Sequence, residues 1–287
     1  MILLADSGST KTDWVLLTES GETARVATVG FNPDYQRTEG IYLELKKSLL
    51  PQIIGHTPEK VYFYGAGCST PKKIKEVSDA IQLAFPQANV FVDHDLMAAA
   101  RALCGNQAGL PCILGTGCNS SVFNGEKIIA NVPSLGFWLG DEGSGGYMGR
   151  QLVIWFLNNE LPADLQKAFH EQFPETNYAQ VMEHVYRKEY PNRYLASFAT
   201  FLEPHRQHPF IQQLLHDSFQ MFFQRQLGKY PDYKHLPAHF VGSIAFFNQE
   251  ILKEVAAKNG YTVEKVIKSP LEGLIDYHLL LEQDFRD

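Results

Sequence analysis

Two short turns rich in glycine and hydroxyl side chains are candidate phosphate sites. The first is the segment Asp6-Ser-Gly-Ser-Thr-Lys-Thr12, and the second begins with Gly115-Thr-Gly117. Each turn lies between two runs of residues that are typical of β-strands. A turn of small residues lets backbone N–H groups converge on an anion without interference from a Cβ atom, and hydroxyl groups add further donors. Two such turns could hold one polyphosphate from both sides.

The first turn also carries charged groups. Asp6 ends the first apolar run, where its carboxylate could hold Mg²⁺ through water. The residues from Gly8 to Lys11 would present amides and an ammonium group to phosphate. A plain hairpin turn has a similar sequence, so a turn without a ligand stays an open alternative. The sequence has no GxxxxGK[ST] motif and no GxGxxG motif after a strand, which excludes the two phosphate loops that those motifs form.

A pair of aspartates stands where a predicted strand meets a predicted helix. Asp93-His-Asp95 follows the strand-like run 89–92 and precedes an alanine-rich run that is strongly helical. An aspartate in this position is usually an N-cap, which contributes about 1 kcal/mol to helix stability and nothing to catalysis. Asp93 and Asp95 are rivals for either role.

The third unusual segment is Gly136-Phe-Trp-Leu-Gly-Asp-Glu-Gly-Ser-Gly-Gly146. It combines two aromatic residues, two carboxylates and many glycines without a clear preference for helix or strand, which is typical of a ligand-binding loop. The alternative is a helix N-cap formed by Asp141 or Ser144. Capping and ligand contact are compatible.

The elements that must position these residues form two similar series. Strands are expected at 2–5, 15–17, 25–29, 61–64 and 89–92, and helices at 38–50, 74–85 and 96–103. The pattern restarts with strands at 112–115, 121–123 and 127–131, turns helical over 150–229, and ends with strands at 238–241 and 263–267 and helices at 251–257 and 271–281. Two βββαβαβα halves predict an α/β architecture with ligands in a cleft at the carboxyl ends of both sheets.

Length and composition predict folded domains and a small-molecule ligand. The chain has 287 residues, of which 45% are hydrophobic and 20% charged. Its net charge of -7 and the absence of a basic tract argue against nucleic acid. An anionic nucleotide would need local attraction from Lys11, backbone donors and Mg²⁺.

The first apolar run is too short for a secretory signal and no run is long enough for a membrane span, so we expect a cytoplasmic protein. The four cysteines lack paired spacing and are expected to be reduced and mostly buried.

With these segments in hand, the chain resembles the superfamily of sugar kinases, actin and Hsp70 ATPases. Within it the chain is similar to the N-acetylglucosamine kinases and their relatives, the benzoyl-CoA reductase activator ATPases. The resemblance covers nearly the full length and rests on six segments in order. These are 4–15, Gly30-Phe-Asn-Pro33, Asp95 with its helix, Gly115-Thr-Gly-Cys-Asn119, Gly140-Asp-Glu-Gly-Ser144 and Val241-Gly-Ser-Ile244.

The resemblance implies two ribonuclease H-like, actin-like ATPase domains. The first would span residues 1–107 and carry sugar-site residues. The second would span residues 108–287, with a helical insertion at about 150–232 and a final helix that could pack back on the first domain. The implied ligands are ATP, Mg²⁺ and a small sugar, and a homodimer is possible.

The resemblance also implies roles for single residues. Asp6 would organise Mg²⁺, Asp95 would be the base for a sugar hydroxyl, and the sugar ring would be held by Asn32 and Asp141 with Gly136 lining the pocket. The residues that would contact the nucleotide are Gly8, Ser9, Thr10, Lys11, Thr12, Gly115, Thr116, Gly117, Asn119, Gly242 and Ser243. The implied reaction is phosphorylation of the 6-hydroxyl of an amino sugar, N-acetylglucosamine first.

Two residues depart from the pattern of the family, and two other functions remain as alternatives. Leu135 stands where the most similar N-acetylglucosamine kinases carry a Trp in the sugar pocket, and Cys118 replaces a Ser in the second turn. The cysteine-based zinc motif of repressor-type sugar kinases is missing. A reductase-activating ATPase would need an iron-sulfur cluster, for which the cysteine spacing offers no ligand set. A sugar- or nucleotide-binding regulator without catalysis is the other alternative, against which the presence of Asp6 and Asp95 argues.

Overall fold

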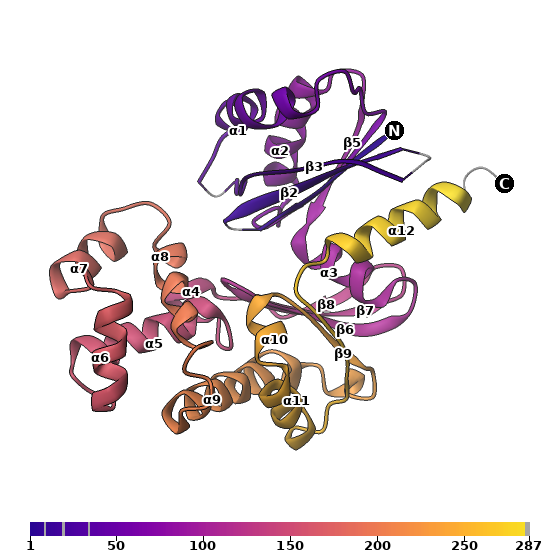
Figure 1. The fold of residues 1–287 in the computed structure, drawn as a ribbon. Helices are drawn as coiled ribbons and strands as arrows, with labels where there is room; N and C mark the ends of the chain where they lie inside the picture. The colour runs from indigo at the N-terminus through magenta and orange to yellow at the C-terminus, as the bar shows by residue number, and fades with distance from the viewer. Residues whose placement is uncertain (9, 19–20, 34, 285–287) are drawn as a thin grey trace. The chain divides into compact units, whose positions relative to one another are not determined.

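The computed structural model describes residues 1–8, 10–18, 21–33 and 35–284, and the chain divides into two compact units. The first unit consists of residues 1–105 and the segment from Pro270 onward, and the second unit consists of residues 106–269. Each unit is built on its own five-stranded mixed sheet (Figure 1). The chain therefore leaves the first unit once and returns to it for its last helix.

The sheet of the first unit has the strand order β3-β2-β1-β4-β5. Its strands are β1 (Ile2–Ser7), β2 (Lys11–Thr18), β3 (Gly21–Val29), β4 (Lys60–Gly65) and β5 (Asn89–His94). The first three strands are antiparallel neighbours, whereas β4 runs parallel to both β1 and β5. The register aligns Ser7 with Gly65 and Gly65 with His94, so β1, β4 and β5 end at the same edge of the sheet.

Helices cover both faces of this sheet. Helix α1 (Thr38–Glu44), its continuation through Leu45–Leu49 and Leu50–Gln52, and α2 (Pro71–Ala84) share a buried core with β1, β2 and β4. Helices α3 (Asp95–Cys104) and α12 (Leu271–Asp284) pack against each other and contact β1. A Cβ at Gly273 would lie 2.5 Å from the carbonyl oxygen of Ala102, so glycine permits this close approach. The last helix therefore belongs to the first unit.

The sheet of the second unit repeats the strand order of the first. Read from β8, its order is β8-β7-β6-β9-β10, with three antiparallel neighbours followed by two parallel ones. The strands are β6 (Ala108–Leu114), β7 (Cys118–Asn124), β8 (Ile128–Asn131), β9 (Ala238–Val241) and β10 (Val263–Ile267). The doubled series predicted from the sequence is thus confirmed at the level of strand order.

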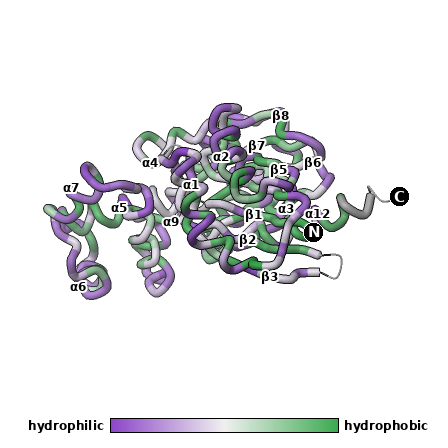
Figure 2. Tube along the Cα trace, turned by 90° about the horizontal axis from the view of Figure 1, so that it is seen from above, coloured by the Kyte–Doolittle hydropathy of each residue, from purple (hydrophilic) through white to green (hydrophobic). Residues whose placement is uncertain are grey.

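A helical segment stands between β8 and β9. Its helices are α4 (Gly136–Leu139), α5 (Gly145–Leu157), α6 (Ala163–Gln172), α7 (Tyr178–Tyr186), α8 (Pro191–Ser197) with the 3-10 turn Phe198–Phe201, α9 (Pro209–Arg225), and the 3-10 turns Leu227–Lys229 and Pro231–Tyr233. After β9 come α10 (Ser243–Phe247) and α11 (Gln249–Lys258). Hydrophilic and hydrophobic stretches alternate along α6 and α7 in Figure 2, as in helices with one face on a core.

The first glycine turn is shorter than the sequence predicts. We expected the second strand to begin near Val15, but β2 begins at Lys11. The cause is the backbone pairing of β1 with β2, which continues through Asp6 opposite Asp13 to Ser7 opposite Thr12. Lys11 and Thr12 are therefore strand residues.

Candidate functional site

The predicted site residues of the first unit begin at the β1–β2 turn. The N–H of Gly8 donates to the carbonyl of Lys11 at 3.0 Å, which closes the turn. Thr10 is exposed, and its carbonyl accepts from the N–H of Gly30 at 3.0 Å. Ser9 lies outside the described residues. The turn is thus a closed hairpin end with an exposed tip.

The polar side chains of Lys11 and Thr12 are engaged within this hairpin. Nζ of Lys11 lies 2.8 Å from a carboxylate oxygen of Asp13. Thr12 is fully buried, its hydroxyl donates to the carbonyl of Val29 at 3.1 Å, and it lies 2.7 Å from the hydroxyl of Ser7. Thr12 therefore links β2 to both neighbouring strands instead of presenting its hydroxyl to solvent.

Asp6 lies among other carboxylates. Burial raises the pKa of Asp6 to about 7, the negative charges of Asp95 and Asp13 add to the rise, and the charge of Lys11 opposes it. Asp13 is the direct cross-strand partner of Asp6, and like charges in such a pair repel. The site has hard oxygen donors and excess negative charge, which fits a divalent cation such as Mg²⁺.

The carboxylates do not form a complete metal cage. Within the described ranges, no group of three or more His, Cys, Asp or Glu side chains is placed to hold a metal ion. Mg²⁺ commonly keeps several waters and binds through one or two carboxylates together with substrate phosphates. Asp6 fits that kind of site.

The structure separates the roles of Asp93, His94 and Asp95. The N-cap of α3 is His94, whose Nδ1 accepts from the N–H of Met97 at 3.0 Å. The carboxylate of Asp93 accepts from the backbone N–H of His94 at 2.8 Å and lies 3.6 Å from Nε2 of His94. Neither aspartate is the cap.

Asp95 is the first residue of α3. Burial raises the pKa of its carboxyl, whereas the charge of His94 and the backbone N–H groups of Asp95 and Leu96 oppose that rise. A carboxylate with a raised pKa is a stronger base than an ordinary surface aspartate. Asp95 thus has the character of a base and lies within electrostatic range of Asp6.

Asn32 is held by the chain around it. Its backbone N–H donates to Oε1 of Gln36 at 3.0 Å, and its carbonyl accepts from the N–H groups of Tyr35 and Gln36. Gly67 has a φ of +82°, and a Cβ there would lie 2.3 Å from Oδ1 of Asn32. The sequence marks Gly67 only as the end of a strand, but its lack of a side chain is what makes room for Asn32.

In the second unit the two predicted glycine-rich segments form one hydrogen-bonded structure. The carbonyls of Gly115 and Thr116 accept from the N–H groups of Gly145 and Gly146 at 2.8 and 2.9 Å. The N–H of Gly115 donates to the carbonyl of Gly117 at 3.0 Å, which closes the turn. The start of α5 therefore fixes the second turn.

Asp141 braces the same turn. It is 8% exposed, and its Oδ1 accepts from the backbone N–H of Cys118 at 3.2 Å and from the hydroxyl of Ser134 at 2.5 Å. Burial raises the pKa of Asp141, and these two hydrogen bonds oppose the rise. The N-cap of α5 is Ser144, which accepts from the N–H of Tyr147. Gly136 begins α4 with a φ of 72°.

Asn119 ties β7 to β8. Its Oδ1 accepts from the backbone N–H of Ser120 at 2.9 Å and from Nδ2 of Asn131 at 3.0 Å. The side chain of Asn119 therefore stabilises the strands next to the turn.

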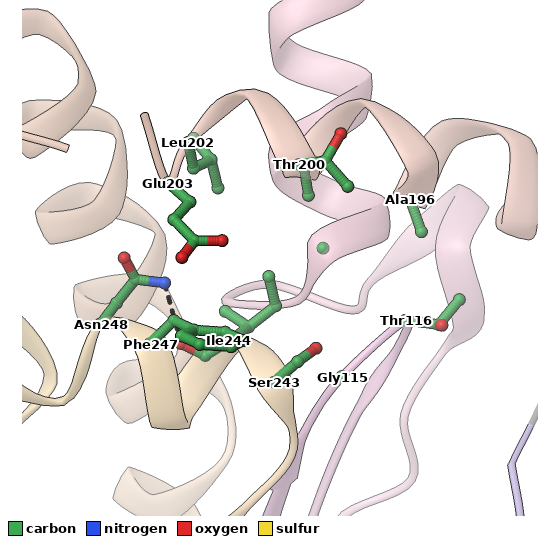
Figure 3. A pocket seen from close by; sticks show the side chains of 12 residues that line it. Gly115, Thr116, Ala196, Thr200, Leu202, Glu203, Ser243, Ile244, Phe247 and Asn248 are labelled. Carbon is green, nitrogen blue, oxygen red and sulfur yellow. Dashed lines mark hydrogen bonds between the residues drawn. The ribbon is translucent and has the colours of Figure 1, made fainter. Parts of the chain in front are cut away.

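A pocket of about 180 Å³ opens beside this turn, entirely within the second unit (Figure 3). Gly242 directly precedes the pocket residue Ser243; its φ is +124°, and a Cβ there would lie 2.2 Å from the carbonyl oxygen of Leu114. Residues from the turn, from the start of α5, from the region of α8 and from α10 line the pocket: Gly115, Thr116, Gly145, Ala196, Ala199, Thr200, Leu202, Glu203, Ser243, Ile244, Phe247 and Asn248.

Sequence reasoning found only part of this lining. Gly115, Thr116 and Ser243 were predicted to contact nucleotide, and the structure brings them to one pocket. The wall formed by residues 196–203 was missed, because it lies in the helical segment and carries no motif. Spacing along the helix after Ser243 could have indicated Phe247, one turn further on.

The cysteines are buried in both units. Cys68 and Cys104 lie in the first unit and Cys112 and Cys118 in the second, and all are free thiols. Burial raises the pKa of the Cys118 thiol well above its ordinary value.

No helix in the described part of the chain is long and apolar enough to cross a membrane.

No family model and no curated protein matches the chain. A solved structure of a proposed N-acetylglucosamine kinase from Porphyromonas gingivalis is similar at 43% identity and a TM-score of 0.92, over 97% of this chain and 98% of its own. A second proposed N-acetylglucosamine kinase, from Chromobacterium violaceum, shares 16% identity with a TM-score of 0.73 over 96% and 98%. A ROK hexokinase from Thermus thermophilus shares 14% identity with a TM-score of 0.54 over 98% and 99%.

The last two likenesses show the fold alone. Together with the repeated five-stranded sheets, the similarities confirm the predicted α/β fold with two ribonuclease H-like domains.

Proposed function

This chain belongs to the N-acetylglucosamine kinase family of sugar kinases, and from that membership we propose that it transfers the γ-phosphoryl group of ATP to the 6-hydroxyl of an amino sugar. N-acetylglucosamine is the first candidate acceptor, because the similar protein from Porphyromonas gingivalis is described as a proposed N-acetylglucosamine kinase. The observation that supports the proposal is that β1 and β5 end at the same edge of the first sheet, which brings Asp6 within electrostatic range of the half-buried Asp95.

In this proposal Asp95 accepts the proton of the sugar 6-hydroxyl as the oxygen attacks the γ-phosphorus. A positioned base of this kind contributes chiefly through alignment and proton acceptance, because phosphoryl transfer requires little covalent help from the protein. Asn32, held beside Gly67, would bind other hydroxyls of the ring, and Gly136 and Asp141 are the further residues proposed to contact the sugar.

Backbone groups of the two glycine turns are proposed to bind the nucleotide. Gly8, Thr10 and Lys11 of the first turn would contact phosphate, together with Ser9. In the second unit, phosphate would bind at Gly115–Gly117, and the nucleoside would enter the pocket beside Gly242 and Ser243. Thr12 and Asn119 act by holding the two turns in shape, since their side chains are hydrogen-bonded within the protein.

Asp6 would hold Mg²⁺, which when bound neutralises phosphate charge and orients the phosphates. The charge of Lys11 lowers the pKa of Asp6, so an ammonium group already lies near the Asp6 carboxylate in the absence of a metal. The assignment of Mg²⁺ to this site rests on the excess of carboxylates around Asp6.

A panel of hexoses and N-acetylhexosamines tests the proposal through ADP release in the presence of ATP and Mg²⁺. We expect ADP release that depends on sugar and is greatest with N-acetylglucosamine. Nucleotide binding without turnover on any sugar in the panel would contradict the proposal and favour a regulator without catalysis.

A further inference from the structure

Three polar side chains in the pocket of the second unit make no hydrogen bond within the described part of the protein. They belong to Thr116, Ser243 and Glu203. Among the other polar side chains of the lining, Thr200 donates to the carbonyl of Ser197 at 2.8 Å, and Nδ2 of Asn248 donates to the carbonyl of Ile244 at 2.9 Å. Oδ1 of Asn248 has no hydrogen-bond partner, but this atom is buried from solvent. Thr116, Ser243 and Glu203 are at least partly exposed, so their side chains are the polar groups accessible to a ligand.

These groups differ in chemistry along the pocket. Thr116 and Ser243 offer hydroxyl donors, and the hydroxyl of Ser243 points toward the side where Gly115 and Thr116 lie (Figure 3). Glu203 lies toward the opposite end, and Figure 3 shows its carboxylate pointing into the pocket. A carboxylate offers only acceptors and repels phosphate. Donors therefore lie at one end of the pocket and an acceptor at the other.

A nucleotide has the complementary order of groups. Its phosphates need donors, and its ribose offers two neighbouring hydroxyls, which the two oxygens of one carboxylate can accept together. Its base needs apolar surface, which buried Leu202 and Ile244 provide. Glu203 is exposed, so its carboxylate is suited to the ribose at the rim of the pocket and not to the base on the apolar floor.

We propose that Glu203 is a specificity-determining residue that accepts hydrogen bonds from the ribose hydroxyls and so selects ribonucleotides over deoxyribonucleotides. This inference rests on the nucleotide-binding part of the proposed function. A hydrogen bond to a charged group has a strength that corresponds to roughly 10- to 100-fold in affinity.

Calorimetric titration with ADP, 2′-deoxy-ADP and 3′-deoxy-ADP tests the inference without any sugar. The wild-type protein should bind ADP roughly 10- to 100-fold more tightly than either deoxy analogue. Glu203→Ala should bind all three with similar affinity, and Glu203→Gln, which keeps one acceptor oxygen, should give an intermediate preference. The inference is wrong if wild type binds ADP and its deoxy analogues with equal affinity. It is also wrong if the ratio of these affinities is the same in wild type and in both variants.

Two controls separate ribose recognition from other effects. Glu250→Gln removes an exposed carboxylate outside the pocket lining and should leave the ADP preference unchanged, which controls for the loss of charge. Inosine diphosphate differs from ADP only in the base, so the ratio of its affinity to that of ADP should be equal in wild type and Glu203→Ala. A change in that ratio with an unchanged deoxy preference would mean that Glu203 contacts the base, and the inference would be wrong.

The outcome is independent of catalysis. A protein that phosphorylates no sugar but prefers ADP to its deoxy analogues would refute the proposed function and leave the role of Glu203 intact. Sugar phosphorylation without any preference for ADP over its deoxy analogues would support the proposed function and refute the role of Glu203.

Discussion

Asp6 at the end of β1 and Asp95 at the start of α3 lie close enough for their charges to interact, although most of the first unit separates them in sequence. The parallel strands β1, β4 and β5 produce this proximity, because they end at one edge of the sheet and α3 begins directly after β5.

The pKa of Asp6 predicts a pH-dependent loss of stability. Since folding raises this pKa from 3.8 to about 7, the folded state binds more protons than the unfolded state between those values. The stabilising contribution of protonated Asp6 to the free energy of unfolding is therefore fully present below pH 4 and is lost as the pH rises through 7. The free energy of unfolding should fall by at most about 1.4 kcal/mol per pH unit over this range. Without Mg²⁺ and nucleotide, Asp6→Asn should gain thermal stability relative to wild type over this range. If the thermal stabilities of wild type and Asp6→Asn change equally with pH, Asp6 does not titrate in this way.

His278 predicts the opposite pH dependence. It is fully buried, and its Nε2 lies 2.8 Å from the hydroxyl of Tyr64. Burial and then the charge of Arg101 lower its pKa from 6.5 to about 3, so the unfolded state binds the extra proton between those values. Stability should fall as the pH drops from 6.5 toward 3, and His278→Gln should remove this component. Denaturant midpoints at pH 4 to 7 check it; an equal acid dependence in the variant would contradict the expectation.

Asp95→Asn should abolish most phosphoryl transfer. If Asp95 is the base, kcat falls by about 10²- to 10⁴-fold, while ADP binding in the absence of sugar changes little. Asp93→Asn is the matched control, because Asp93 is hydrogen-bonded to the backbone of His94 and should cost much less activity. Full activity of Asp95→Asn would show that its carboxylate serves only the helix.

Two glycine substitutions separate folding from binding in the second unit. A Cβ at Gly115 meets nothing within 4 Å, so Gly115→Ala should change stability by less than about 0.5 kcal/mol but weaken ATP binding by occupying the phosphate turn. Gly242→Ala should destabilise the protein by about 2 kcal/mol or more, because of its positive φ and the contact with Leu114. Thermal unfolding and ATP titration of both variants measure the difference. Unchanged ATP affinity in Gly115→Ala would refute phosphate contact at this turn.

The fold was largely predictable because its signals are local. Runs of alternating or continuous apolar residues marked most strands, and the alanine-rich run after Asp95 marked α3. The repetition of a glycine turn between strands indicated the doubled topology. The limits of the first turn were not predictable, since the ladder that draws Lys11 and Thr12 into β2 depends on pairing with β1.

The site was less predictable because several of its parts depend on distant contacts. The cap of α3 is His94, although an aspartate stands on either side of it and aspartate is the commoner cap. Asp141 carries a motif signal, yet its contacts with Cys118 and Ser134 arise only in the folded unit. Glu203 had no signal at all, because nothing in its local sequence indicates that this helical segment forms one wall of a pocket.

The most direct test of the proposed reaction is identification of its product. Purified wild-type protein is incubated with ATP, Mg²⁺ and N-acetylglucosamine, and the sugar phosphate is analysed by mass spectrometry and by the coupling of its phosphorus to ring or exocyclic protons in nuclear magnetic resonance. We predict N-acetylglucosamine carrying phosphate on the 6-hydroxyl, formed together with an equal amount of ADP and absent with Asp95→Asn. Phosphate on the anomeric hydroxyl, or no sugar phosphate while ATP is bound, would contradict it.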